Sequence, residues 1–405
     1  MASQITDTSI TRAEIETHAI SSGLWATPEL RQRNGYVLSP CVYVVSKDQQ
    51  AALQRLAQTV YLSLGSLENA LGAIAPLGQR SLPQAEFFRL ATRARRGLFS
   101  PGVESGLPPI VKVDLVQDGE GRYFVAEVDA YNPRGLGYIS FLEESLPSSL
   151  RWQRFPGVSM VRDLLLQQSS TWTLIVSEFE RYYEAAFQVF CQVMQKHGVD
   201  ISLVCEQDLS LGDLSRIETR HVLLLPESFN RRPQVRDALL DLYRHGEIKL
   251  WYPPKAYLGS KAFLPFLAEH GMEEFIPKTM LVGQKMNGAI SAFVERNKPV
   301  VLKGCMSSGM KQVVFSDLHA ERFAGALELA SQAKNPQWIL QDQVPQASIP
   351  VIIFDDEGNR VTRDYYFRVI AHVTKDGVLD VEVTGRPDRL VHGAPDCIQL
   401  PSILE

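Results

Sequence analysis

The sequence lacks the cysteine spacing of a disulfide framework or a structural zinc site. It has five cysteines, an odd number, and no two of them are neighbours: Cys41, Cys191, Cys205, Cys305 and Cys397. Disulfide frameworks and cysteine-based zinc sites use cysteines at paired spacings, so the sequence argues against both. Unpaired cysteines are typical of a reducing compartment, and we therefore expect a cytoplasmic protein.

Long apolar runs and a strong excess of charge are also missing. No stretch approaches the ~20 consecutive apolar residues that a membrane-spanning helix needs. Residues 1–17 are polar and acidic and lack the apolar core of a targeting peptide. The formal net charge is −5, which argues against a general polyanion-binding surface. We expect neither a membrane nor a nucleic acid as a partner.

Several catalytic signatures are absent as well. The eight histidines are scattered singly, without an evident zinc-ligand or triad partner, and no G-x-S-x-G elbow is present. The residues that follow the strand predicted at 172–176 include no glycine, which excludes the turn of a Rossmann dinucleotide site. Gly309 is not followed by Lys-Ser or Lys-Thr, so the loop that it ends is not a Walker loop.

What the sequence does contain is a predicted hairpin with acidic residues on both strands, at 113–129. Asp114 lies on the first strand, and the turn D-G-E-G reverses the chain. Glu127 and Asp129 are two residues apart on the second strand and therefore share a face. Carboxylates that converge repel one another unless a cation lies between them, and oxygen-only ligation suits Mg²⁺. The hairpin predicts a magnesium site, with a solvated surface hairpin as the alternative.

The string from Glu127 to Leu136, E-V-D-A-Y-N-P-R-G-L, resembles the motif E-Y-N-A-D-T-P-T-G-L of the glutathionylspermidine synthase family, a circularly permuted branch of the ATP-grasp superfamily. In that family the Glu and the Asn two residues later bind Mg²⁺, and an R-x-D on the preceding strand supplies a third ligand and a catalytic arginine. The resemblance implies Mg²⁺ ligands at Asp114, Glu127 and Asp129. Lys112 replaces that arginine; it keeps the charge but loses the planar fork. The resemblance still implies a catalytic role for Lys112.

Two different patterns flank the hairpin. Residues 1–110 are predicted to be mainly helical, because apolar residues recur at helical spacing at Leu53, Leu56, Val60, Leu64 and Leu67. Residues 165–257 alternate short apolar strands with amphipathic helices, with strands expected at 172–176, 201–205, 221–225 and 248–252 and helices at 178–197 and 233–245. That rhythm predicts a parallel α/β unit. It resembles the pre-ATP-grasp domain of the superfamily.

Residues 258–405 resemble an ATP-grasp nucleotide-binding region. An apolar strand, P-V-V-L-K, ends in Lys303 and is followed by a loop of small residues at 304–309. A strand end delivers one ammonium group to a phosphate, while backbone N–H groups of a Gly and Ser loop bind the remaining oxygens. The resemblance implies phosphate contacts from Lys303, from Lys261 at a predicted helix start, and from loop residues Ser307, Ser308 and Gly309.

The segment W-I-L-Q-D-Q-V at 338–344 resembles the hinge strand that runs along adenine in ATP-grasp proteins. The implied contacts are Gln341, Asp342, Gln343 and Val344, with the backbone of the last three pairing with the base. An ordinary edge strand is the alternative.

A final antiparallel pair is predicted at 365–373 and 378–384, joined by an Asp-Gly turn. Arg368 and Arg386 on or after these strands resemble the arginines that the superfamily directs at phosphates or at the acyl phosphate. The arginine fork suits this task because it binds phosphate through two parallel hydrogen bonds.

The fold class implied by the resemblance is α+β: a permuted ATP-grasp fold in which the hairpin at 111–150 completes the site, with the parallel α/β unit and an N-terminal helical region. The implied cofactors are ATP and Mg²⁺. The implied reaction joins a small-molecule carboxylate to an amine through an acyl phosphate, and it needs no side-chain nucleophile. Two alternatives stay open: an ATP-grasp kinase that phosphorylates a hydroxyl group, and a degenerate nucleotide-binding module without turnover.

Overall fold

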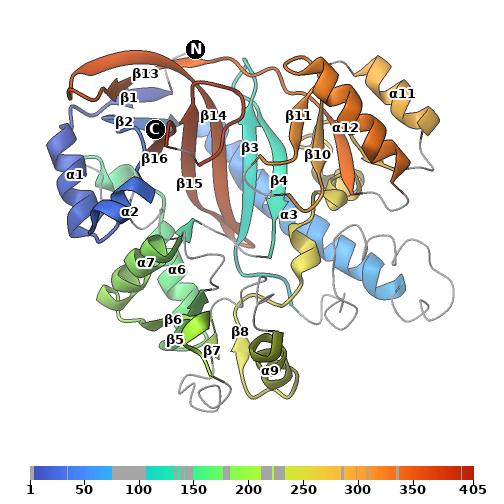
Figure 1. The fold of residues 1–405 in the computed structure, drawn as a ribbon. Helices are drawn as coiled ribbons and strands as arrows, with labels where there is room; N and C mark the ends of the chain where they lie inside the picture. Colours follow the sequence, from blue (N-terminus) through green and yellow to red (C-terminus); the bar gives the residue numbers. More distant parts are fainter. Residues whose placement is uncertain are drawn as a thin grey trace.

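The computed structural model describes residues 4–33, 35–74, 106–131, 135–136, 141, 149–176, 183–210, 221–222, 233–283, 287–297, 299–307, 310–333, 337–393 and 395–405. Helices and sheets are mixed in this part of the chain, as the predicted α+β class requires (Figure 1). None of the described helices combines the length and the apolar composition that crossing a membrane demands.

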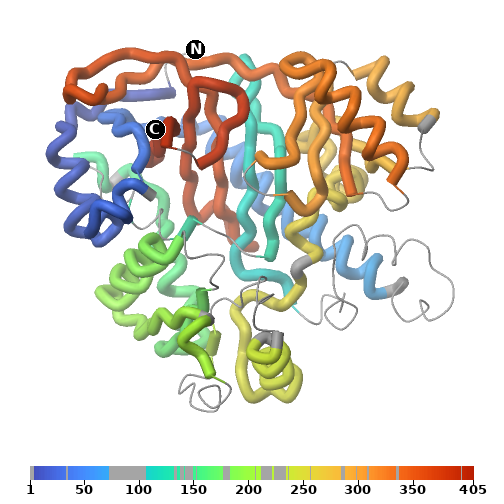
Figure 2. The backbone as a smooth tube through the Cα atoms, viewed as in Figure 1, coloured from blue at the N-terminus to red at the C-terminus, as the bar shows by residue number. Residues whose placement is uncertain are grey.

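The largest sheet of the described residues, here the central sheet, has the strand order β1-β2-β16-β15-β14-β3-β4, with β13 paired to β14. Its strands are β1 (Ile5–Asp7), β2 (Cys41–Val45), β3 (Val111–Gln117), β4 (Tyr123–Asp129), β13 (Ile349–Phe354), β14 (Arg360–Thr374), β15 (Gly377–Arg386) and β16 (Ile398–Leu404). β16 and β2 pair in parallel. The sheet brings the N-terminal strands, the acidic hairpin and the C-terminal strands side by side (Figure 2).

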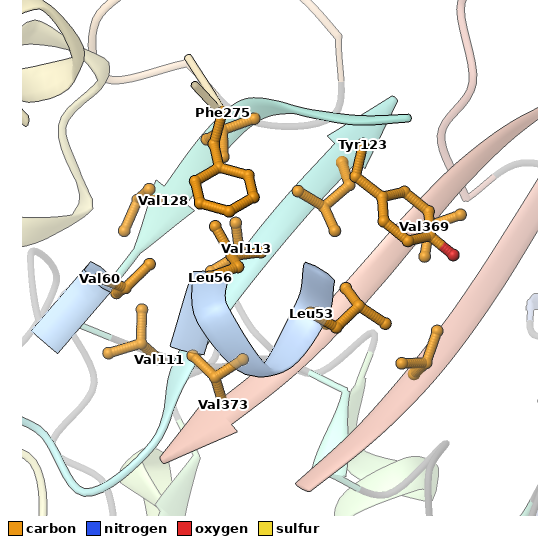
Figure 3. Packing of buried hydrophobic residues seen from close by; sticks show 14 of the residues in the cluster. Leu53, Leu56, Val60, Val111, Val113, Tyr123, Val128, Phe275, Val369 and Val373 are labelled. Carbon is orange, nitrogen blue, oxygen red and sulfur yellow. The ribbon is translucent and has the colours of Figure 1, made fainter. Parts of the chain in front are cut away.

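The long helix α3 (Lys47–Ile74) covers one face of the central sheet. Its predicted apolar stripe is confirmed as core: Leu53, Leu56, Val60, Leu64 and Leu67 are all fully buried. Alternate residues of β3 and β14 meet this stripe, as Figure 3 shows for Val111, Val113, Val369 and Val373. Because strand side chains alternate between faces, the residues between them point to the opposite face, away from α3.

The N-terminal segment is less purely helical than predicted. It contains α1 (Arg12–Ser21), α2 (Pro28–Arg33) and α3, but also β1 and β2, which the sequence analysis did not predict. β2 reads C-V-Y-V-V and is almost entirely buried, so it has no alternating pattern to reveal it. Through β2 and β1 this segment becomes part of the central sheet.

A second, antiparallel sheet, here the small sheet, has the order β11-β10-β12-β9. Its strands are β9 (Thr279–Val282), β10 (Val300–Gly304), β11 (Val313–Phe315) and β12 (Trp338–Asp342), and α11 (Asn287–Arg296) and α12 (Ala320–Gln332) lie against it (Figure 1). Val300 and Leu302 pack in the same apolar cluster as Phe323 of α12. By alternation, Lys303 points to the other face, toward the central sheet.

A third sheet is parallel, with the order β6-β5-β7-β8, as the alternation of strands and helices predicts. It consists of β5 (Thr171–Val176), β6 (Asp200–Cys205), β7 (His221–Val222) and β8 (Lys249–Leu250), with α6 (Gly157–Leu166), α7 (Glu184–Lys196) and α9 (Pro233–Arg244) around it. Short helical turns then lead to the small sheet: η7 (Ala256–Gly259), η8 (Lys261–Phe263), α10 (Leu264–Leu267) and η9 (Ala268–Met272). The five cysteines form no disulfide in the described part of the chain.

Candidate functional site

A pocket, here the inter-sheet pocket, lies between the central sheet and the small sheet. β3, β4 and β14 supply one wall, and β10, β11 and β12 supply the other. The side chains that line it are Asp114, Val116, Ala126, Glu127, Lys261, Val301, Lys303, Ser307, Met310, Val313, Phe315, Gln341, Asp342, Gln343, Val344, Gln346, Phe367, Arg368, Arg389 and Val391. Most of the residues that the sequence predicts for the nucleotide and the metal ion therefore share one cavity.

Asp114 is held between two cations. Lys112 Nζ lies 3.1 Å from Asp114 Oδ1, and Arg368 Nη1 donates to Asp114 Oδ2 at 3.2 Å. Burial alone raises the pKa of Asp114, but the charges of Lys112 and Arg368 outweigh it and lower that pKa well below its usual range. Burial lowers the pKa of Lys112, but Asp114, Asp129 and Glu127 outweigh it and raise that pKa. Asp114 is therefore an anion and Lys112 a cation near neutral pH.

The strand register fixes this arrangement. Asp114 lies directly opposite Glu127, and Lys112 lies directly opposite Asp129. Arg368 is opposite Val116, one rung along β3 from Asp114. Residues that face one another across strands share a side of the sheet, so the charged groups all project from the face that α3 does not cover.

Lys261 connects the acidic hairpin to the small-residue loop. Its Nζ lies 2.8 Å from Glu127 Oε1 and donates to the backbone oxygen of Ser307 at 2.7 Å. The side chain is buried, and the turn that presents it begins at Ser260, whose hydroxyl accepts from Ala262 N. Lys261 is thus fixed where the predicted metal-binding hairpin meets the predicted phosphate-binding loop.

Lys303 lies deep in the pocket. Its Nζ donates to Gln341 Oε1 at 2.6 Å and to the backbone oxygen of Ala126 at 3.2 Å. Burial and the neighbouring charge of Lys261 lower the pKa of Lys303 to about 8, against the opposing pull of Glu127 and Asp114. Near neutral pH the ammonium group is charged but poorly compensated, so an anion that enters the pocket gains from it.

The predicted metal ligands do not all converge. Asp114 and Glu127 line the pocket, whereas Asp129 accepts from the backbone N–H of Tyr131 at 3.2 Å and is not a lining residue. In the described part of the chain, no group of three acidic, histidine or cysteine side chains is arranged to hold a metal ion. Lys112, Lys261 and Arg368 supply the positive charge among the carboxylates. The oxygen-only donors suit Mg²⁺, and the magnesium site stays a prediction.

Residues 341–344 of the predicted hinge segment line the pocket, but two of their backbone N–H groups already donate hydrogen bonds within the chain. The N–H groups of Asp342 and Gln343 donate to the carbonyls of Lys278 and Pro299 at 2.9 Å and 3.0 Å. These two N–H groups cannot pair with an adenine base while those hydrogen bonds last. The backbone groups of the hinge segment that could still pair with the base are its carbonyls and those of Val344. Among the described residues, Asp342 Oδ1 and Gln343 Oε1 are buried without a hydrogen-bond partner, so side-chain acceptors also reach this wall.

The loop after β10 is only partly described. Ser307 lines the pocket, and its hydroxyl donates to the backbone oxygen of Gly304 at 2.9 Å. Ser308 and Gly309, the other predicted loop contacts, lie outside the described residues.

The two predicted arginines differ in their surroundings. Arg368 faces the pocket, whereas Arg386 binds Asp396 through Nε and Nη2, at 2.9 Å and 2.7 Å, and does not line the pocket. Arg389, three residues later, does line it: Nη1 lies 2.8 Å from Asp317 Oδ2, and the guanidinium lies over Phe315. Arg389 was not among the residues predicted from the sequence, although the string G-R-P-D-R-L contains both arginines.

No family model matches the sequence, and no curated protein matches it. Solved structures with partial likeness include a candidate gamma-glutamylcysteine synthetase from Methylobacillus flagellatus KT, 13% identical with a TM-score of 0.34 over 84% of this chain and 87% of that one. The ATP-grasp ligase PsnB with a minimal precursor is 14% identical, with a TM-score of 0.31 over 52% and 89% of the two chains. D-alanine–D-alanine ligase from Bacillus anthracis with ATP is 12% identical, with a TM-score of 0.26 over 52% and 85%. Such TM-scores decide neither fold nor activity, so function must follow from the site itself.

Proposed function

We propose that this chain is an ATP-dependent carboxylate–amine ligase with a permuted ATP-grasp site. The observation that carries the proposal is the convergence of Lys261, Lys303 and Arg368 with Asp114 and Glu127 in the inter-sheet pocket. Buried cations and buried carboxylates in one cavity suit a polyphosphate bound with a divalent ion better than either ligand alone. The motif that begins at Glu127 supports the same reaction.

The triphosphate of ATP would lie against the ammonium groups of Lys303 and Lys261, with the base between Val301, Phe315 and the hinge. These two lysines come from different elements, but Ser307 O accepts from Lys261 Nζ and so ties that lysine to the loop after β10. A phosphate would compensate the buried charge of Lys303, which the neutral oxygens of Gln341 and Ala126 do only in part. Charge-assisted hydrogen bonds of this kind are the stronger ones in proteins.

Mg²⁺ would be held by Asp114 and Glu127, with Asp129 beside them, and when bound it would neutralise charge on the phosphate oxygens. Lys112 and Arg368 flank Asp114 and orient its carboxylate toward the pocket. A carboxylate substrate would find the same two cations. They would stabilise the charge that develops when its oxygen attacks the γ-phosphorus and ADP leaves.

In the second half-reaction an amine would attack the acyl carbon, an amide bond would form, and phosphate would leave. The chain's part is to hold the acyl phosphate between Lys112 and Arg368 and away from water. The transfer itself needs no side-chain nucleophile. A kinase would stop at a stable phosphorylated product, and a degenerate nucleotide-binding module without turnover would release no ADP.

The test is an ATP-turnover screen on the whole chain with Mg²⁺, a panel of small carboxylates, and hydroxylamine as a generic amine. The proposal expects ADP, free phosphate and a hydroxamate in equal amounts. A kinase would give ADP without free phosphate. Binding of ATP with no ADP for any carboxylate or hydroxyl compound would leave only a nucleotide-binding module.

A further inference from the structure

The chain that leaves the central sheet after β15 crosses to the small sheet. Residues 387–393, here the strap, follow Arg386 at the end of β15. Arg389 and Val391 of the strap both line the inter-sheet pocket. Leu390, between them, packs against the apolar cluster that β10 and β11 form. The strap therefore connects the central sheet to the small sheet beside the pocket.

An ion pair joins the strap to the small sheet. Arg389 Nη1 lies 2.8 Å from Oδ2 of Asp317, which follows β11, and the guanidinium lies over the ring of Phe315, 5.8 Å from its centre. Gln343 of the hinge segment donates Nε2 to the same Oδ2 at 3.1 Å. Burial raises the pKa of Asp317, but the hydrogen bonds from Arg389 and Gln343 outweigh it and lower that pKa. Asp317 is thus an anion near neutral pH and keeps its pairing with the strap.

This ion pair lies near the opening of the pocket rather than at its floor. The side chains of Arg389 and Asp317 are 23% and 35% exposed, whereas Lys303 and Gln341, which line the same pocket, are 8% and 2% exposed. An ion pair with this much exposure contributes little to stability, so it can break and form again readily. Such a contact suits a part of the chain that has to open and close.

Arg386 shapes the strap, although it does not line the pocket. Its Nη1 donates to the backbone oxygen of Leu390 at 2.8 Å, while Nε and Nη2 bind the carboxylate of Asp396 at 2.9 Å and 2.7 Å. The backbone N–H of Leu390 donates to Asp388 Oδ1 at 2.7 Å. Charged side chains therefore fix both backbone groups of Leu390, and they hold the neighbouring Arg389 in place.

We propose that the strap closes the mouth of the inter-sheet pocket and that the Arg389–Asp317 ion pair is its latch. Arg386 is then a positioning residue for the strap. A ligand has to pass the strap to enter or to leave, so the latch sets the rates of exchange more than the affinity. A closed pocket would also shield an acyl phosphate from water, and this consequence rests on the proposed function. Closure over Lys303 does not depend on it.

The first test uses no nucleotide. The whole chain is treated at pH 8 with N-acetoxysuccinimide, a neutral reagent that acetylates uncharged amines, and peptide mapping by mass spectrometry gives the rate at Lys303, whose pKa is about 8. Arg389→Ala should accelerate this reaction roughly five- to thirtyfold, because the ion pair and the contact with Phe315 are both lost. Exposed Lys375 is the internal control and should react at the same rate in both chains. An unchanged rate at Lys303 overturns the closure.

Further variants separate a latch from a local disturbance. Arg322→Ala removes an exposed arginine of α12 and should leave the rate at Lys303 unchanged. Asp317→Asn removes the charge but keeps an oxygen for Gln343, and it should accelerate the reaction about two- to fivefold. In the Arg389→Ala background the same substitution should add nothing, because Asp317 acts through Arg389. Additive effects of the two substitutions overturn the latch. Circular dichroism and thermal unfolding verify that each variant is folded.

The second test follows nucleotide exchange by stopped-flow fluorescence, with N-methylanthraniloyl-ATP and Mg²⁺ as the probe. Arg389→Ala should raise the association and dissociation rates by similar factors and leave the affinity almost unchanged, because the latch is a barrier to passage and not a ligand contact. Faster dissociation with unchanged association would make Arg389 a ligand contact and overturn the latch. Arg386→Ala should raise both rates in the same way, and unchanged rates in this variant refute its positioning role.

The two tests separate the strap from the proposed function. If the labelled nucleotide does not bind but Lys303 reacts faster in Arg389→Ala, the proposed function fails and the strap stands. If the nucleotide binds to Lys303 and neither its exchange rates nor the acetylation rate respond to Arg389→Ala, the strap fails and the proposed function stands.

Discussion

Lys303 is the residue whose chemistry the structure defines best. Its folded pKa of about 8 lies below its ordinary value, so between about pH 8 and 10.5 the folded state binds fewer protons than the unfolded chain. The contribution of Lys303 to the free energy of unfolding therefore rises with pH across that window and is lowest below pH 8. Phosphate in the pocket would favour the charged form, so ATP binding near pH 8.5 should take up protons. Calorimetry in two buffers of different ionisation enthalpy measures that uptake.

Lys303→Ala should abolish the proton uptake and weaken ATP binding about ten- to a hundredfold, because one charge-assisted phosphate contact is lost. Lys375→Ala is the control, since Lys375 is exposed and pairs with Asp376 at 3.1 Å. If Lys303→Ala binds ATP like the unaltered chain, the phosphate contact is wrong.

Glu382 should make the protein less stable at high pH. Its folded pKa of about 7 is above the ordinary 4.5, so between these values the folded state keeps a proton that the unfolded chain has released. The stabilisation is complete below pH 4.5 and is lost as pH rises through about 7, by about 3 kcal/mol in all. Glu382→Gln should therefore match the unaltered chain in urea unfolding at pH 4.5 and exceed it at pH 8. Equal stability at both pH values would mean that the carboxylate is compensated.

Substitutions of Lys112 test whether its positive charge stabilises the reacting acyl phosphate. It faces Asp114 and does not line the phosphate wall, so Lys112→Ala should reduce turnover about a hundredfold or more while ATP affinity changes little, because its partner exists mainly in the transition state. Lys112→Arg, which keeps the positive charge, should retain turnover. Steady-state kinetics with separate ATP titrations resolve the two effects. Full activity of Lys112→Ala would move the catalytic charge to Arg368.

At the scale of elements, local signals in the sequence predict several of the strands, although they missed β1 and β2. The β3–β4 and β14–β15 hairpins follow from Gly-containing turns, and β10 and β12 follow from their apolar runs. The register between distant strands could not be read, because it depends on packing of segments hundreds of residues apart. That register places Glu382 in line with Asp114. Arg389 lies after the end of β15, so no strand pattern predicts that it faces the pocket.

The buried apolar stripe of α3 predicts which leucines of this helix stabilise the fold, and an exposed leucine on the same helix serves as the control. Leu56 is fully buried against the central sheet, whereas Leu62 on the same helix is 73% exposed. Leu56→Ala should cost about 2–5 kcal/mol of unfolding free energy through lost burial and the cavity it leaves. Leu62→Ala should stay within about 0.5 kcal/mol of the unaltered chain. Urea unfolding measures both, and equal losses would contradict the assignment of the buried face.

At the scale of the whole molecule, the inter-sheet pocket joins parts of the chain that lie far apart in the sequence. Lys303 and Gln341 belong to the small sheet, yet their side chains bond to the carbonyls of Ala126 and Val125 in β4. The metal-ligand candidates precede the phosphate lysines in the sequence, but the folded sheets place them face to face. A ligand in this pocket therefore acts on both sheets at once.

ATP with Mg²⁺ at a hundred times its dissociation constant should add about 2.7 kcal/mol to the unfolding free energy, since it binds only the folded state. Because both sheets form the pocket, amide hydrogen exchange should slow in β4 as well as in β10 and β12. The parallel strands β5 and β6 contribute no residue to the pocket and should exchange at unchanged rates. Hydrogen exchange with mass spectrometry, with and without the nucleotide, makes the comparison. Protection confined to the small sheet would mean that the nucleotide does not reach Asp114 and Glu127, and the carboxylates would then need another role.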